Sequence, residues 1–362
     1  MSTATEPEQA FHYLTESNLA LAEAESILAL ATSGGVELQA GELVQAANPF
    51  FFTGFVSPAD VFAQALLLVA QVARTRFYTP PGMVAAILRA ADPVVTVTEG
   101  RVRFESFSAC CGVAARLDLL PQGIDAEHIG TGTTNVDINL PTRALLAQIS
   151  AEAPLRLQVG AQQVGFTTLE GGEVERKVPL PTRWVRGFGE AQAQGARMSA
   201  QFTMTPAQTR EFIRSLPRAS ATKAVSWVVP STRGFRLAPQ ARSNPAACLA
   251  GPERLRFVEP LLRSVTRLQV YGCDANEGQA SSAWQFDLPA MRLTLTLSSE
   301  KSRGFSGEGG LLDDLAHADT AADADLLAAL LAYEPVIDLT VLSADAGWPG
   351  DLERTAHHKL VG

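Results

Sequence analysis

Two spacings of hydrophobic residues alternate along the chain. Apolar residues three or four positions apart predict helices over residues 19–31, 59–75, 81–91, 142–149, 183–195, 206–216 and 251–265. Alternation of apolar and polar residues predicts strands over residues 94–107, 155–159, 164–169, 174–178, 224–229, 234–237, 268–271, 283–288 and 291–297. The strands follow one another through short turn signals such as Glu99-Gly100, without regular βαβ alternation. The pattern therefore predicts an α+β fold, with antiparallel β hairpins packed against helices.

The same pattern divides the chain into four segments. We expect a loosely ordered N-terminal segment with a helix, an α+β domain, an arginine-rich α+β domain and a small C-terminal helical unit, over residues 1–50, 51–180, 181–303 and 304–362. In the last segment, Gly347 stands in the turn between the final two of three short predicted helices. That layout fits a helix-turn-helix, but a three-helix packing unit without a DNA role has the same pattern.

Composition is typical of a folded chain with a large core. Of the 362 residues, 46% are hydrophobic and 19% are charged, which excludes intrinsic disorder of the whole chain. The longest apolar run, Ala65 to Ala70, is far shorter than the roughly 20 residues that cross a bilayer, so we expect no membrane span. The acidic first residues, Met1 to Glu8, lack the layout of a secretory signal, and we expect a cytoplasmic protein.

Charge is distributed unevenly. Residues 1–176 carry 9 basic and 19 acidic side chains, residues 177–303 carry 18 and 8, and residues 304–362 carry 2 and 11. The basic middle is a candidate surface for an acidic partner or nucleic acid, with the acidic C-terminal unit less suited to phosphates. Alternatively, its arginines pair with acids elsewhere in the fold. The arginines that we single out as a candidate recognition surface are Arg183, Arg186, Arg233, Arg236, Arg254 and Arg256.

Cys110-Cys111 is the most unusual local feature. Adjacent cysteines cannot both bind one tetrahedral zinc with ordinary geometry, and Cys248 and Cys273 have no histidine nearby in the sequence. A catalytic thiol would need a base such as His128. We interpret the pair as two small side chains buried on a strand, and we predict no disulfide scaffold from four cysteines.

Two further motifs contain residue types that occur in ligand-binding or catalytic sites. Thr131 to Asp137 carries hydroxyls and an amide that suit a polar ligand, but such residues also satisfy their own backbone in turns, which we favour. Gly304 to Gly310 lacks the Lys-Ser/Thr of a phosphate loop and has Glu308 where a nucleophile elbow needs glycine. We therefore predict no catalytic residue, no bound cofactor and no metal ligand in this chain.

Four stretches resemble bacterial, chiefly actinobacterial, SWIM zinc finger family proteins. They are Phe104 to Pro121 with Cys110 and Cys111, Gly132 to Asp137 with Asn135, Val178 to Trp184, and Arg303 to Gly309. The resemblance covers the chain from about Phe51 to its end. The zinc finger itself has the form C-x-C followed by C-x-H, and the sequence contains neither pattern. Zinc would belong to that missing finger, and the C-terminal unit resembles a winged helix that stops before its wing.

The resemblance implies a non-enzymatic accessory protein. Members of the family resemble adaptors whose genes lie beside those of a MoxR-type AAA ATPase and a von Willebrand factor A protein. We therefore predict an adaptor or scaffold that binds these two proteins, with the basic segment 177–303 as its recognition surface. The alternative is a nucleic-acid-binding protein that uses the same segment together with the C-terminal unit. A thiol enzyme using Cys110 or Cys111 is the third and least favoured hypothesis.

Overall fold

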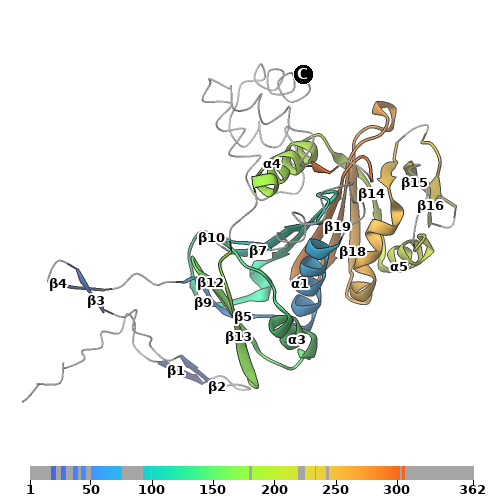
Figure 1. Ribbon diagram of the computed structural model, residues 1–362. Helices are drawn as coiled ribbons and strands as arrows, with labels where there is room; N and C mark the ends of the chain where they lie inside the picture. The colour runs from blue at the N-terminus through green and yellow to red at the C-terminus, as the bar shows by residue number, and fades with distance from the viewer. Residues whose placement is uncertain are drawn as a thin grey trace, which may run out of the picture.

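The computed structural model describes residues 50–75, 93–178, 182–218, 225–301 and 304–305, apart from Glu99, Arg233, Arg242 and Ser243. It also describes the backbone of four short strands nearer the N-terminus: β1 (Asn18–Leu21), β2 (Ser26–Ala29), β3 (Val36–Gln39) and β4 (Glu42–Gln45). The described residues form antiparallel sheets and helices, so the predicted α+β class is confirmed (Figure 1). No helix in these ranges has the length and apolar character needed to cross a membrane.

The largest sheet has eight antiparallel strands. In spatial order they are β10 (Gly132–Asn135), β6 (Val94–Thr98), β7 (Arg101–Phe107), β8 (Val113–Leu119), β20 (Met291–Leu297), β19 (Ser282–Leu288), β18 (Arg267–Gly272) and β14 (Ser199–Met204). β8 pairs with β20, with Leu117 opposite Leu293. This pair joins the segments 51–180 and 181–303, so one continuous sheet crosses the boundary that the sequence pattern suggests.

Two smaller sheets flank this one. The five-stranded sheet contains β13 (Gly171–Arg176), β12 (Gln163–Thr168), β11 (Leu155–Gly160), β5 (Phe50–Val56) and β9 (Ile124–Ile129), in that order. The short 3₁₀ helix η1 (Pro121–Gly123) leads from β8 into β9. The three-stranded sheet contains β16 (Gly234–Ala238), β15 (Val225–Ser231) and β17 (Ala247–Ala250). Another short 3₁₀ helix, η3 (Ala275–Glu277), lies between β18 and β19 along the chain.

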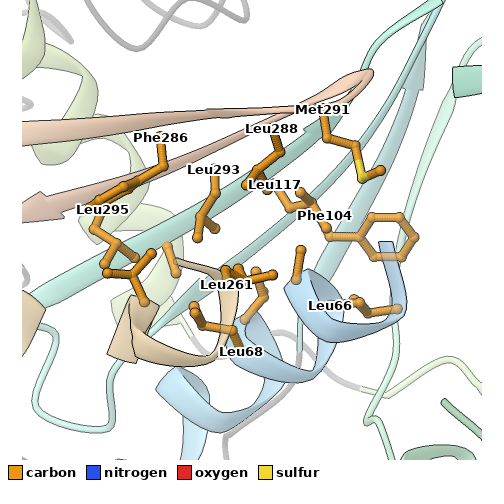
Figure 2. Close-up of a cluster of buried hydrophobic side chains, with 14 of the residues drawn as sticks. Leu66, Leu68, Phe104, Leu117, Leu261, Phe286, Leu288, Met291, Leu293 and Leu295 are labelled. Atoms are coloured by element: carbon orange, nitrogen blue, oxygen red, sulfur yellow. The ribbon is translucent and has the colours of Figure 1, made fainter. Parts of the chain in front are cut away.

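Helices lie side by side on one face of the large sheet. α1 (Ala59–Arg74) packs against β7 and β8 and contacts both α3 (Leu140–Gln148) and the 3₁₀ helix η2 (Pro252–Leu261), and η2 in turn contacts α5 (Pro206–Ser215) (Figure 1). Leu66 of α1 lies near Phe104 of the sheet, whereas Leu68 lies between α1 and η2, near Leu261 (Figure 2). Every second strand residue meets the helices, as Phe104 and Leu293 do. This alternation between apolar and polar positions places the main core between the helices and the sheet.

Several predicted elements take another form in the structure. Residues 19–31 contain the paired strands β1 and β2 in place of a helix, and Leu19 and Leu21 fit strand spacing as well as helical spacing. The helix expected from Gly251 to Val265 is a 3₁₀ helix that contains Pro260, which has no N–H to donate. The turn expected within 131–137 is the strand β10. The helix predicted over 81–91 and the C-terminal unit from Leu311 lie outside the described residues.

Candidate functional site

The Cys110-Cys111 pair occupies a tight turn between β7 and β8. Ser108 closes the turn, because its backbone N–H donates to the Val113 carbonyl at 2.8 Å and its carbonyl accepts from the Cys111 N–H at 2.7 Å. Cys111 is buried with φ of 54°, and Cys110 is half-buried with its Sγ 3.5 Å from the Ser108 Oγ. The prediction of two buried side chains on a strand is therefore wrong in its secondary structure and correct in burial for Cys111 alone.

Arg254 lies beneath this turn and is fully buried. Its guanidinium donates to the Gly112 carbonyl at 2.7 Å, the Ala250 carbonyl at 2.7 Å and the Ser298 carbonyl at 2.9 Å. Burial lowers the pKa of Arg254 to about 10, so the group stays cationic at neutral pH. Arg254 therefore joins η2, β17, the cysteine turn and the end of β20 from the inside, and it contributes nothing to a recognition surface.

An aromatic cluster covers the other side of the turn. Trp184 and Phe188 belong to α4 (Thr182–Ala196), and their rings contact Phe107 with centroids 5.8 Å and 4.9 Å apart; Phe305 contacts the same ring. The Phe305 N–H donates to the Cys111 carbonyl at 2.9 Å. A methyl group on Gly304 would overlap the backbone of the cysteine turn. Three of the stretches that carry the family resemblance therefore meet here as packing partners.

Asn135, in the remaining stretch, also has a structural contact. Its side-chain amide donates to the Val178 carbonyl, and the Val178 N–H donates to the Asn135 carbonyl at 3.1 Å. The chain leaving β13 is thus held beside β10 before it enters α4. The prediction that this stretch forms a turn whose polar side chains bind their own backbone is therefore wrong, because Asn135 lies on the strand β10 and binds a carbonyl 43 residues away in the sequence.

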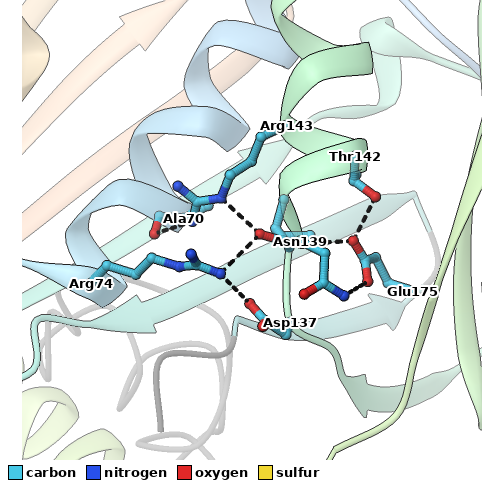
Figure 3. A network of polar contacts seen from close by, with 8 residues as sticks. Ala70, Arg74, Asp137, Asn139, Thr142, Arg143 and Glu175 are labelled. Atoms are coloured by element: carbon cyan, nitrogen blue, oxygen red, sulfur yellow. Dashed lines mark hydrogen bonds and ion pairs between the residues drawn. The ribbon is translucent and has the colours of Figure 1, made fainter. Parts of the chain in front are cut away.

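A polar network ties α1, α3 and β13 together (Figure 3). Arg74, in the last turn of α1, pairs with Asp137 at 2.9 Å. Arg143 of α3 donates to the Ala70 carbonyl at 2.9 Å. Glu175 of β13 accepts from the Asn139 N–H at 2.7 Å and from the Asn139 side-chain amide at 2.6 Å, and the Thr142 hydroxyl donates to it as well. The network fixes the start of α3 on the strand, and Asp137 serves in it.

The face of the large sheet opposite the helices buries charged groups. Asp118 of β8 accepts from the Nε of Arg103 at 2.7 Å and from the Nε of Arg116 at 2.9 Å. Glu105 lies one alternation further along β7, opposite Arg116 in the strand register. Burial raises the pKa of Glu105 to about 7, with the Arg103 charge opposing that rise.

An arginine-rich surface forms where α5 meets η2. Arg256 of η2 donates to the Leu216 carbonyl at 2.6 Å and pairs with Glu259, which places η2 beside the C-terminal end of α5. Arg214 in the last turn of α5 and Arg218 just beyond it are exposed, and Arg210 lies one turn before Arg214. We call this the α5–η2 surface and define it by Arg210, Arg214, Arg218 and Arg256, with Glu211 and Glu259 as its acids.

Of the six arginines expected at a recognition surface, the structure describes the side chains of three, and these three lie in different surroundings. Arg256 belongs to the α5–η2 surface, Arg236 is exposed on β16, and Arg254 is buried. The side chains of Arg183 and Arg186 and the whole of Arg233 lie outside the described residues. Arg210 and Arg214 were not among the predicted residues, although their i, i+4 spacing places both on one side of the predicted helix 206–216.

The structure does not bring Cys110 together with His128, the base that a catalytic thiol would need. His128 lies on β9 of the five-stranded sheet, whereas Cys110 lies in a turn of the eight-stranded sheet. Cys248 and Cys273 are buried, and burial raises the pKa of Cys248. Within the described residues, no three histidine, cysteine or carboxylate side chains form a group suited to a metal ion.

Comparison with known proteins adds no assignment. No protein-family model matches the chain, and no curated protein matches it in sequence. Among solved structures, the chain is similar to the proliferating cellular nuclear antigen of Entamoeba histolytica, with a TM-score of 0.42 and 11% identity over 69% of this chain and 98% of that one. A similarity at this level assigns neither a family nor a function.

Proposed function

We propose that this chain is a non-enzymatic adaptor that binds an acidic partner protein through the α5–η2 surface. The observation that carries the proposal is the local excess of arginine at that surface. Arg214 and Arg218 are exposed there, whereas Arg256 pairs with Glu259 and donates to the Leu216 carbonyl, and so joins η2 to the end of α5. Exposed guanidinium groups bind carboxylates in a bidentate manner and raise association rates with acidic proteins.

The placement of the motif residues supports a scaffold role. Cys111 and Trp184 pack inside the molecule, Asn135 binds a backbone carbonyl, and Asp137 pairs with Arg74. These residues stabilise the junction of α1, α4 and the cysteine turn. The family resemblance suggests that the partners are a MoxR-type AAA ATPase and a von Willebrand factor A protein.

Binding between purified proteins tests this proposal. We expect the unaltered chain to bind one of the two partners, and R214E/R218E to weaken that binding by at least about tenfold, since each reversed charge adds repulsion. The matched control R176E/R197E reverses two other exposed arginines and should bind within about twofold of the unaltered chain. The proposal is wrong if the unaltered chain binds neither partner, or if both variants weaken binding equally.

Nucleic-acid binding is the second candidate, and the same arginine surface favours it. Phosphate contacts make affinity fall steeply with salt, by roughly 0.9 log units per contact for each decade of salt. Fluorescence anisotropy with labelled double- and single-stranded DNA and RNA at about 50 and about 200 mM salt distinguishes the two candidates. Salt-sensitive binding that R214E/R218E abolishes would favour nucleic acid, whereas no binding to any of these probes removes this candidate.

A further inference from the structure

A groove lies between α3 and the β12–β13 hairpin, at the end of the helix row opposite α5. Its cavity volume is about 550 Å³. Ala144, Leu145 and Ile149 line it on the α3 side, and Leu169 and Glu173 line it on the hairpin side. One wall is therefore a largely apolar helix, and the other is the end of a β hairpin.

The rim of this groove exposes large apolar side chains. Leu169, in the hairpin turn, is 86% exposed, and Leu140, at the start of α3, is 74% exposed. Pro141, beside Leu140, also lines the groove. Exposed leucines beside a cavity gain free energy when a partner covers them, by about 25 cal/mol for each Å² of apolar surface buried.

The charge of the groove has one sign. Glu170 and Glu173 are carboxylates, and the described lining residues include no lysine, arginine or histidine. Neither glutamate forms an ion pair within the described part of the chain. Bound phosphates or acidic side chains would be repelled here, whereas lysine or arginine beside apolar residues would be attracted.

The groove runs along the edge of a sheet. β13 is the end strand of the five-stranded sheet, and no described strand pairs with the outer side of its six residues, although Lys177, the next residue, forms an isolated antiparallel bridge with Val136. The backbone groups of such an edge can pair with an added strand. Glu175, held by Asn139 and Thr142, keeps β13 against α3, so the edge is already ordered before anything binds.

We propose that this groove and the open β13 edge bind an extended segment of a partner protein in which lysine or arginine alternates with apolar residues. Main-chain hydrogen bonds to β13 would hold the segment, its apolar side chains would enter the groove beside Leu145 and Leu169, and its cations would face Glu170 and Glu173. The groove borders Gly171, Gly172 and Glu173 of β13, a stretch of about 10 Å, which suits pairing with about three residues of the segment. This inference goes beyond the proposed function, because it concerns a different surface with the opposite charge.

A labelled octapeptide of alternating valine and lysine is the probe, and its valine–glutamate counterpart is the control peptide. We expect the valine–lysine peptide to bind the full chain, the counterpart to bind at least about tenfold more weakly, and bound peptide to protect β13 amides from hydrogen exchange. E170K/E173K should weaken binding by at least about tenfold, and L169S, which removes an apolar contact without changing the charge, should weaken it as well. D125K/E300K makes the same charge change at exposed carboxylates elsewhere and should bind within about twofold of the unaltered chain.

Three results would overturn the proposal. Equal binding of both peptides would show nonspecific adhesion, and binding unaffected by E170K/E173K would place the peptide elsewhere. Self-association in sedimentation that L169S abolishes, without peptide binding, would identify a second copy of the chain as the occupant. R214E/R218E should leave peptide binding unchanged, so failure here is distinguishable from failure at the α5–η2 surface.

Discussion

Arg254 and Arg256 stand two residues apart on η2, and their surroundings differ completely. Arg254 is fully buried and donates to backbone carbonyls of three separate segments. Arg256 faces α5 and takes part in a surface where neighbouring arginines are exposed. The same positive charge therefore binds interior backbone carbonyls at one position, and at the other it joins η2 to α5 beside the exposed Arg214 and Arg218. Net charge along a sequence cannot separate these two uses.

Two glutamates on β13 differ in the same way as these two arginines. Glu175 is buried, and its hydrogen bonds hold β13 against α3. Glu173, two residues earlier on the same strand, lines the groove. Substitution of a buried group such as Arg254 or Glu175 should lower stability, and substitution of an exposed group such as Arg214 or Leu169 should leave it nearly unchanged. Three stability measurements test that division.

Removal of the buried arginine should have the largest effect. Arg254→Met removes the guanidinium donor from the carbonyls of Ala250 and Ser298 and one of the donors to the Gly112 carbonyl, and we expect a loss of roughly 3 kcal/mol or more in the free energy of unfolding. Arg214→Met, at the exposed position, should change it by less than about 0.5 kcal/mol. Urea unfolding followed by tryptophan fluorescence measures both. Similar losses in the two variants would remove the distinction.

The pH dependence of stability tests the charged face of the large sheet. Burial raises the pKa of Glu105 from 4.5 to about 7, so its protonated form is favoured in the folded state. The resulting stability is fully present below pH 4.5 and is lost as pH rises towards 7, by at most about 3 kcal/mol. Glu105→Gln should flatten this part of the urea-midpoint profile between pH 5 and pH 8. The exposed control Glu170→Gln should retain the slope of the unaltered chain.

We expect the smallest changes in stability from substitutions beside α3. Glu175→Gln loses one charged acceptor of the Asn139 and Thr142 donors, and we expect a loss of about 1–2 kcal/mol with faster hydrogen exchange in β13. Leu169→Ser, at a side chain that is 86% exposed, should stay within about 0.5 kcal/mol of the unaltered chain. A large loss in Leu169→Ser would mean that this leucine supports the fold and is not available to a partner.

Local pattern was sufficient for much of the fold. The hairpin β6–β7 and the strands β19 and β20 follow from alternation over a few residues, and α1 ends at Arg74, close to the predicted Thr75. The strands β5, β8, β9 and β17 were not predicted. β8 reads Val-Ala-Ala-Arg-Leu-Asp-Leu, and it buries Arg116 and Asp118 where alternation usually exposes polar residues. Because these two charged residues form a buried ion pair, the sequence of this central strand resembles that of a strand at the protein surface.

The two candidate binding surfaces could not be predicted from the sequence. The α5–η2 surface depends on Arg256 reaching Leu216, 40 residues away in sequence, and the groove depends on α3 packing against β13. Neither contact leaves a local signal. The four stretches that carry the family resemblance were correctly picked out as special, but three of them meet at the cysteine turn as packing partners rather than as a chemical centre.

The amino-acid sequence by itself determined the α+β class, the antiparallel hairpins, most helix positions and the opposite charges of successive segments, because each depends on neighbours within a turn or a hairpin. Only the tertiary structure decided that Arg254 is internal while Arg256 lies at the surface, that Cys111, Trp184 and Phe305 pack together, and that acids and leucines border one groove. The physical reason is that burial and charge pairing are set by long-range packing, where η2 and β20 close against strands more than a hundred residues earlier in the chain.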